Sequence, residues 1–262
     1  MIRRSKEPMA ITEAELTSMT RELEDMHQAT FPSVRATLGE FTDNLAHMAT
    51  RARSSRRGVL LGVGGVAALG ALAACGSDDK KKDTATPSAS ASGSPYTGDL
   101  KVVALAAALE NLAVTAYDGA LKRASDGKLG TVPPAIATFI TTARAQHADH
   151  AAAWNGVLTK AKLPAIDGAP LTITQGAVDA LGATDSVASV VKLALGLEEV
   201  AAQTYTFAAA NVTDAGGIMT AATIQPVEQM HAAILHFVLG EYPVPLSFVP
   251  IDKAVKPDAL TK

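Results

Sequence analysis

A short pattern is written twice in this chain, about 88 residues apart. Residues 109–117 read LENLAVTAY and residues 197–205 read LEEVAAQTY. Each copy is followed by two side chains, three residues apart, that are able to ligate a metal: His147 and His150 after the first, Glu228 and His231 after the second. A glutamate helix followed by a helix with such a pair, written twice, is the sequence form of a four-helix bundle with a two-metal centre between its helices.

Composition agrees with an all-α fold and excludes some functions. The 262-residue chain is 48% hydrophobic but only 4% aromatic, and alanine, the best helix former, dominates the hydrophobic share. A net charge of −3 provides no basic face for nucleic acid, so we expect no nucleic-acid partner. The single cysteine, Cys75, excludes an intramolecular disulfide.

The folded domain is predicted over residues 99–262. Apolar spacing, turn residues and capping residues predict four long helices, over residues 99–124, 133–160, 185–211 and 218–240, with a short helix over 173–182 in the long connection. Residues 213–217 are expected to end the third long helix and to separate it from the fourth. Pro226 either kinks the last helix or marks its true first turn near Thr223. The tail from Tyr242 is expected to pack along the bundle without regular structure.

An export signal is predicted over residues 55–75. Ser55-Arg-Arg is followed by an apolar run of 17 residues with five glycines, which is marginal for a membrane span, and then by Leu72-Ala-Ala-Cys75. This order resembles a twin-arginine signal joined to a bacterial lipobox. The resemblance implies a lipidated Cys75 as the first mature residue, anchored on the outer face of the cytoplasmic membrane. The alternative is a buried apolar helix with an incidental cysteine.

The segments on either side of this signal have different characters. Residues 76–98 are rich in Ser, Thr, Ala, Pro and Gly and predict a flexible linker. Residues 1–54 form an unusually long segment for the start of a signal. They are a long n-region, a stretch before a later start such as Met48, or a cytoplasmic segment beside an uncleaved anchor. We assign no role to His27 and His47 within them.

Helical spacing puts four pairs of polar side chains on common faces: Glu228 with His231, His147 with His150, Glu110 with Tyr117, and Glu198 with Tyr205. The two single glutamates border apolar stripes, and burying an unpaired carboxylate costs several kcal/mol. Either a divalent cation or a histidine on a facing helix is expected to compensate each carboxylate. The two tyrosines are core residues or lie beside a metal.

The chain resembles the ferritin-like superfamily, in particular exported bacterial ferritin-like domain proteins, over residues 100–250. The resemblance rests on Glu110, His150, Glu198, Glu228 and His231, and on the ending Gly240-Glu-Tyr-Pro-Val-Pro-Leu-Ser-Phe. In di-iron members of that superfamily, two helices give one glutamate each and two give Glu-x-x-His. The resemblance implies a metal site among six candidates: Glu110, His147, His150, Glu198, Glu228 and His231.

This chain departs from the family pattern at His147, which stands where a glutamate is expected. Three carboxylates neutralise two divalent ions less well than four would, and a histidine does not bridge two metals as a carboxylate does. A single metal is therefore as reasonable as a di-iron centre. Iron is the first candidate, manganese and zinc also suit these ligands, and a site without metal stays open.

Other polar residues are expected outside the site. Asp149 and Glu199 point about 100° away from their neighbours His150 and Glu198. His236 faces away from His231 and is predicted to be structural or exposed. Trp154 is predicted to be a core anchor rather than an electron relay.

These observations predict a membrane-tethered extracytoplasmic ferritin-like protein that binds iron or another divalent metal, with a redox or ferroxidase-like role open to it. The alternative is a non-enzymatic surface lipoprotein that uses a metal-free bundle as an interaction scaffold, because fold does not fix function. Whether the protein is an enzyme is left open, as is a homodimer. A closed storage cage is disfavoured by an anchor on every subunit.

Overall fold

The computed structural model describes the backbone of residues 9–61 and 94–261. It also describes the side chains of these residues, except those of residues 48–61. Every regular element in these ranges is helical: α1 (Glu13–Leu61), α2 (Asp99–Ser125), α3 (Pro134–Lys160), α4 (Thr174–Gly182), α5 (Val187–Asn211), α6 (Ala215–Leu239) and the 3-10 turn η1 (Pro257–Ala259). The all-α prediction is confirmed. The expected export segment from residue 62 on, with Cys75, and the linker to residue 93 lie outside the described residues.

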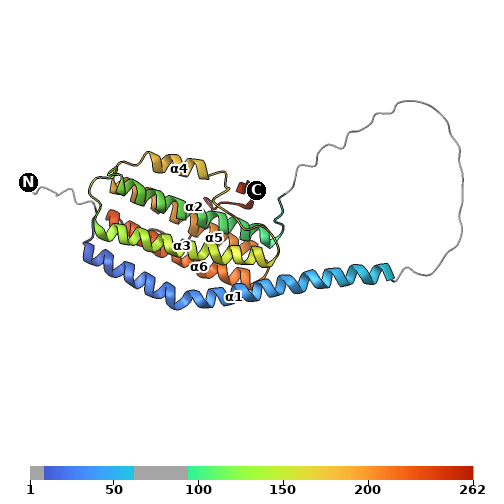
Figure 1. The fold of residues 1–262 in the computed structure, drawn as a ribbon. Helices are drawn as coiled ribbons and strands as arrows, with labels where there is room; N and C mark the ends of the chain where they lie inside the picture. The colour runs from blue at the N-terminus through green and yellow to red at the C-terminus, as the bar shows by residue number, and fades with distance from the viewer. Residues whose placement is uncertain (1–8, 62–93, 262) are drawn as a thin grey trace, which may run out of the picture.

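Helices α2, α3, α5 and α6 form the predicted bundle (Figure 1). α2 and α3 make one antiparallel hairpin, and α5 and α6 make the other. The long connection between the hairpins carries α4, which lies over the outside of the bundle. All four predicted long helices agree with the structure to within three residues at each end.

The helix ends follow ordinary capping chemistry. The hydroxyl of Ser186 accepts a hydrogen bond from the Ser189 amide at 3.3 Å, and the Ser189 hydroxyl accepts one from the Ser186 amide at 3.1 Å, which forms a capping box at α5. α6 ends at Gly240, whose φ of 75° is the left-handed conformation that glycine adopts without strain.

The start of the last helix differs from the prediction. α6 begins at Ala215, inside the expected break, and it continues through Pro226 as a helix, so Pro226 does not mark its first turn. The reason is the cap: one carboxylate oxygen of Asp214 accepts hydrogen bonds from the amides of Gly216 and Gly217 at 2.8 and 3.4 Å. The cap satisfies the amide N–H groups of the two glycines, which would otherwise donate to water.

The N-terminal helix α1 packs against the bundle, on α3 and α6 (Figure 1). Its buried positions recur every three or four residues: Leu16, Thr20, Leu23, His27, Phe31, Val34, Leu38 and Phe41. This spacing gives a continuous stripe along one face of a helix. The later part of α1 extends past the bundle. The four-helix bundle is thus joined by a fifth long helix, which comes from the N-terminal segment that precedes the expected export signal.

Polar contacts and a glycine fix α1 in place. The Asn44 amide donates to Asp214 at 3.0 Å, and Asp214 is itself the cap of α6. A Cβ at Gly216 would lie 2.9 Å from the Thr37 carbonyl oxygen and 3.1 Å from Phe41 Cβ. Glycine is therefore needed where α1 crosses the first turn of α6.

The apolar core is divided into two clusters along the bundle. One contains Leu105, Leu112 and Leu158, and the other contains Phe139 and Leu235. Among the described residues, α2 alone has the length and hydropathy of a membrane span, and 61% of its apolar stretch is buried in the bundle. Its hydropathy is thus accounted for by its place in the core. A band of buried polar side chains separates the two clusters.

Candidate metal centre

All six predicted ligands lie in this polar band, and each is at most 2% exposed. We call them the Glu/His cluster: Glu110 from α2, His147 and His150 from α3, Glu198 from α5, and Glu228 and His231 from α6. The structure brings all six side chains together. Their role as metal ligands stays a prediction.

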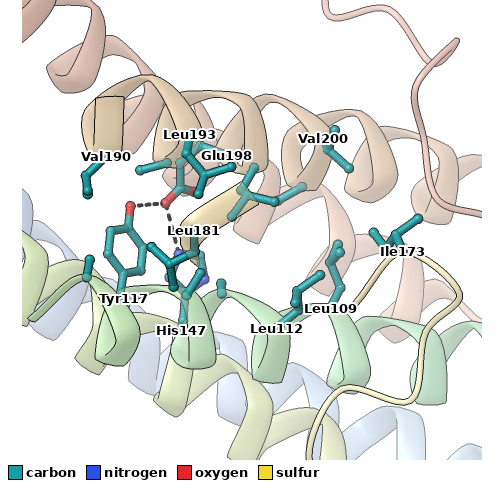
Figure 2. Close-up of a pocket in the computed structure, with 16 residues that line it drawn as sticks. Leu109, Leu112, Tyr117, His147, Ile173, Leu181, Val190, Leu193, Glu198 and Val200 are labelled. Carbon is teal, nitrogen blue, oxygen red and sulfur yellow. Dashed lines mark hydrogen bonds and ion pairs between the residues drawn. The ribbon is translucent and has the colours of Figure 1, made fainter. Parts of the chain in front are cut away.

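His147 lies between the two single glutamates. Its Nδ1 is 2.7 Å from Glu110 Oε2, and its Nε2 is 3.1 Å from Glu198 Oε1. Figure 2 shows its ring pointing toward Glu198. With both nitrogens protonated, the imidazolium donates a hydrogen bond to each glutamate and links α2 to α5 through α3.

Two pairs of side chains, Glu110 with His150 and Glu198 with His231, are arranged around Glu228 with approximate twofold symmetry. His150 Nδ1 lies 3.4 Å from Glu110 Oε1 and 3.5 Å from Glu228 Oε1. His231 Nδ1 lies 3.3 Å from Glu198 Oε2 and 3.7 Å from Glu228 Oε2. Each single glutamate therefore faces one of these two histidines in addition to His147, and Glu228 stands between His150 and His231.

The tyrosines of the repeated pattern cross between its two copies. Tyr205 donates to Glu110, and Tyr117 donates to Glu198, as Figure 2 shows for the second pair. The indole of Trp154 donates to the Tyr205 oxygen at 2.9 Å, which makes Trp154 a core residue as predicted. Burial, and then the adjacent carboxylate, raise the pKa of both tyrosines well above the ordinary value, so they remain donors.

Charge pairing sets the ionisation of the single glutamates. Burial alone raises the pKa of Glu110, but the charge of His150 and the hydrogen bond from His147 outweigh it and lower that pKa to about 2. The pKa of Glu198 is likewise well below its ordinary value: burial raises it, and His147 and His231 lower it further than that. Both glutamates are carboxylates at neutral pH.

The histidines shift the other way. Burial lowers the pKa of His150, but Glu110 and Glu228 overcome this and raise it to about 9. For His147, burial opposes the effect of Glu198 and Glu228, and its pKa lies well above 6.5. The pKa of His231 is raised as well, because Glu198 outweighs burial. Without a metal, the cluster is a set of imidazolium–carboxylate contacts.

The residues fit a divalent cation. Two overlapping groups have one ligand atom per residue, all within 4.8 Å of one another: Glu110, His147, His150 and Glu228 in the first, and His147, Glu198, Glu228 and His231 in the second. Both carboxylate oxygens of Glu228 and Nδ1 of His150 are buried without a hydrogen-bond partner. Buried polar atoms are normally satisfied, and a cation in the first group would be a partner for the Glu228 carboxylate and for Nδ1 of His150.

Three residues around the cluster were not predicted. His150 Nε2 lies 3.3 Å from Nε2 of His27 in α1. His231 Nε2 lies 2.9 Å from Oε1 of Gln146, whose amide donates to Glu24 of α1 at 2.8 Å. The available signal was the spacing Glu24-x-x-His27, which repeats the spacing of Glu228 and His231, inside the apolar stripe of α1.

The residues predicted to lie outside the site do so. Asp149 pairs with Arg35 at 3.3 Å on the surface. His236 is mostly buried and makes contacts of 2.8 Å to Glu241 and 3.5 Å to Glu199, so its role is structural.

A small apolar cavity of about 30 Å³ lies beside the cluster, between α2 and α5 (Figure 2). Leu181 of α4 lines one side, and the polar residues at its edge are Tyr117, His147 and Glu198. A Cβ at Gly119 would lie 2.4 Å from a Leu181 methyl carbon, so this glycine lets α4 approach α2 closely. The space is about that of one or two water molecules.

Known families account for the bundle but not for α1. A family model described as a ferritin-like domain matches residues 98–241. Comparisons with curated proteins and with solved structures gave no match. The matched range contains α2 to α6 and the whole Glu/His cluster, while α1 precedes it. On its sequence, its helical bundle and its buried cluster, the chain belongs to the ferritin-like domain family.

Proposed function

We propose that this protein binds one divalent metal ion in the Glu/His cluster, with iron the first candidate and manganese or zinc the alternatives. The observation that carries the proposal is that three of the four buried atoms without a hydrogen-bond partner belong to the cluster: the two Glu228 oxygens and His150 Nδ1, the fourth being His27 Nδ1. They lie in the first ligand group, whose other members are Glu110 and His147. If His147 stays protonated, the ligands of the ion are Glu110, His150 and Glu228. Buried polar atoms without a partner cost free energy, and a bound cation would remove that cost.

Charge favours one ion over two. Three carboxylates carry three negative charges, which one divalent ion and one remaining imidazolium neutralise. Two ions leave an excess positive charge even with every histidine neutral, before any hydroxide binds. His147, with one nitrogen on each single glutamate, is placed to be the remaining imidazolium. It then takes the place of a second cation between Glu110 and Glu198.

Histidine and carboxylate ligands suit redox-active iron, and a bound iron would supply one-electron chemistry. The chain's own residues exclude bulk water from the cluster and hold protons at Tyr117 and Tyr205. We place the protein on the outer face of the cytoplasmic membrane, because the Arg56-Arg57 pair, the apolar run and Leu72–Cys75 follow in the order of a lipoprotein signal.

A second candidate is a metal-free scaffold. It is favoured by the equal number of carboxylates and histidines, since each single glutamate already has a histidine within 3.3–3.4 Å. In that case, the paired cluster holds the bundle together, and function lies on the surface.

Elemental analysis of the untagged full-length chain separates the two. After loading and removal of free metal, we expect one ion per chain in the wild type, and a loss of that ion in Glu228→Gln, which removes the central charge at constant shape. Glu199→Gln, on α5 but outside the cluster, is the matched control and should keep the ion. No retained metal in the wild type, with an unchanged melting temperature on loading, would refute metal binding and support the scaffold.

A further inference from the structure

The outward-facing nitrogens of His150 and His231 lead to the same helix. His150 contacts His27 directly at 3.3 Å, and His231 reaches Glu24 through Gln146. Glu24 and His27 are three residues apart on α1 and therefore share a face. α1 lies outside the residues that match the ferritin-like domain, so this contact is an addition to that domain.

The ring of His27 is held in a defined orientation. It stacks on Phe31 with a centroid separation of 4.8 Å and an interplanar angle of 18°. The Arg35 guanidinium covers the same Phe31 ring at 4.8 Å, and it pairs with Asp149 of α3 at 3.3 Å. These contacts, spaced one helical turn apart on α1, give His27 little freedom to turn away from His150.

The hydrogen bond between the two histidines has one consistent direction. Nδ1 of His150 faces the carboxylates, so its Nε2 carries a proton that points at His27. The facing Nε2 of His27 is then the acceptor of this hydrogen bond. The Gln146 oxygen is the corresponding acceptor for His231.

We propose that His27 and Glu24 are positioning residues of the metal centre, so that α1 helps to determine metal affinity. This inference rests on the proposed metal binding. A ligating histidine normally gives its second N–H to an acceptor, which fixes its tautomer and its orientation. His27 does this for His150, and Glu24 does it for His231 by holding Gln146. His27 has the larger effect, since it acts directly on a ligand of the group with the unsatisfied atoms.

The position of α1 in the sequence links it to cleavage of the signal. The expected lipidation site at Cys75 lies between α1 and α2 in the sequence. Cleavage before Cys75 would remove Glu24 and His27 from the chain that carries the cluster. The unprocessed and processed proteins would then hold the metal with different affinities.

The test is a Co²⁺ titration of the full-length chain, read by visible absorption and by competition with a chelator. His27→Leu should lower the affinity about 10- to 100-fold and shift the Co²⁺ spectrum. His27→Gln keeps an acceptor and should restore most of the affinity. Glu24→Leu should have a smaller effect than His27→Leu, and Glu24→Gln should be close to wild type.

Leu16→Ala is the control for packing, because Leu16 is fully buried on α1 but takes no part in these contacts. It should lower the melting temperature and leave the spectrum of the bound Co²⁺ unchanged. Equal affinities of the wild type and His27→Leu would overturn the positioning role while metal binding stands. Equal losses in His27→Leu and His27→Gln would also overturn it, since the acceptor would not matter. A wild type that binds no Co²⁺ would overturn both proposals.

Discussion

The stability of the metal-free protein should fall as the pH rises from neutral to alkaline. His150 has a pKa of about 9 in the folded protein against an ordinary value of 6.5. A group whose pKa is raised by folding stabilises the fold fully below its unfolded pKa, here 6.5. That stabilisation is lost as the pH rises through the folded pKa, here about 9.

The expected loss is large compared with the stability of a typical domain. A pKa that differs by one between the folded and unfolded states changes the free energy of unfolding by about 1.4 kcal/mol. His150 alone should therefore stabilise the fold by about 3 kcal/mol at pH 6.5, and this stabilisation should be lost at alkaline pH. The pKa of Glu110, about 2 against an ordinary 4.5, has the opposite sign. Its stabilisation is complete above pH 4.5 and is lost as the pH falls toward 2. His27, whose pKa is lowered by burial to about 4, adds a loss of stability as the pH falls from 6.5 toward 4. The metal-free protein should thus be most stable near pH 6.5.

Urea unfolding of the full-length chain with a chelator present, at intervals from pH 5 to pH 10, measures this profile. His150→Gln removes the titrating group and should flatten the alkaline limb. Metal-loaded protein should show the reverse slope, because ligating histidines must be neutral and binding releases protons. If the free energy of unfolding of the metal-free protein stays constant or rises from pH 6.5 to 9.5, the imidazolium–carboxylate pairing described above is wrong.

Three further substitutions test other parts of the structure. Tyr205→Phe removes the donor to Glu110 and a partner of Trp154, so it should cost about 1–3 kcal/mol in chemical unfolding, more than the exposed Tyr242→Phe. Gly216→Ala should cost about 1–3 kcal/mol by overpacking against α1, and faster proteolysis within α1 should accompany that loss. Cys75→Ala should move the protein from the membrane fraction to the aqueous fraction of cells, and an unchanged membrane share would refute lipid anchoring.

The bundle and its cluster could be predicted because both depend on local spacing. Glu110 and Glu198 occupy equivalent places in a repeat, and three-residue spacing puts Glu228 and His231 on one face whatever the partner helix is. The crossed pairs, in which Tyr205 holds Glu110, could not be predicted in the same way. They depend on the register between α2 and α5, which is set by packing in three dimensions.

The role of α1 was missed for a related reason. Its apolar stripe was present in the sequence, but a stripe does not say which surface it covers. The neighbouring basic pair and apolar run suggested a signal, and a signal's n-region is not expected to pack against the mature domain. The contact between His27 and His150 joins residues 123 positions apart in the sequence. Only the folded arrangement brings them together.

The substitution at position 147 changes what this bundle is able to hold. A glutamate there would add a fourth negative charge and favour a second cation. His147 instead supplies its own positive charge, with one nitrogen 2.7 Å from Glu110 and the other 3.1 Å from Glu198. A second ion in this place would have to displace a proton held by two carboxylates in a buried site, and such a proton is hard to remove. In the proposed metal-bound state, the cluster would therefore hold one metal ion and one proton.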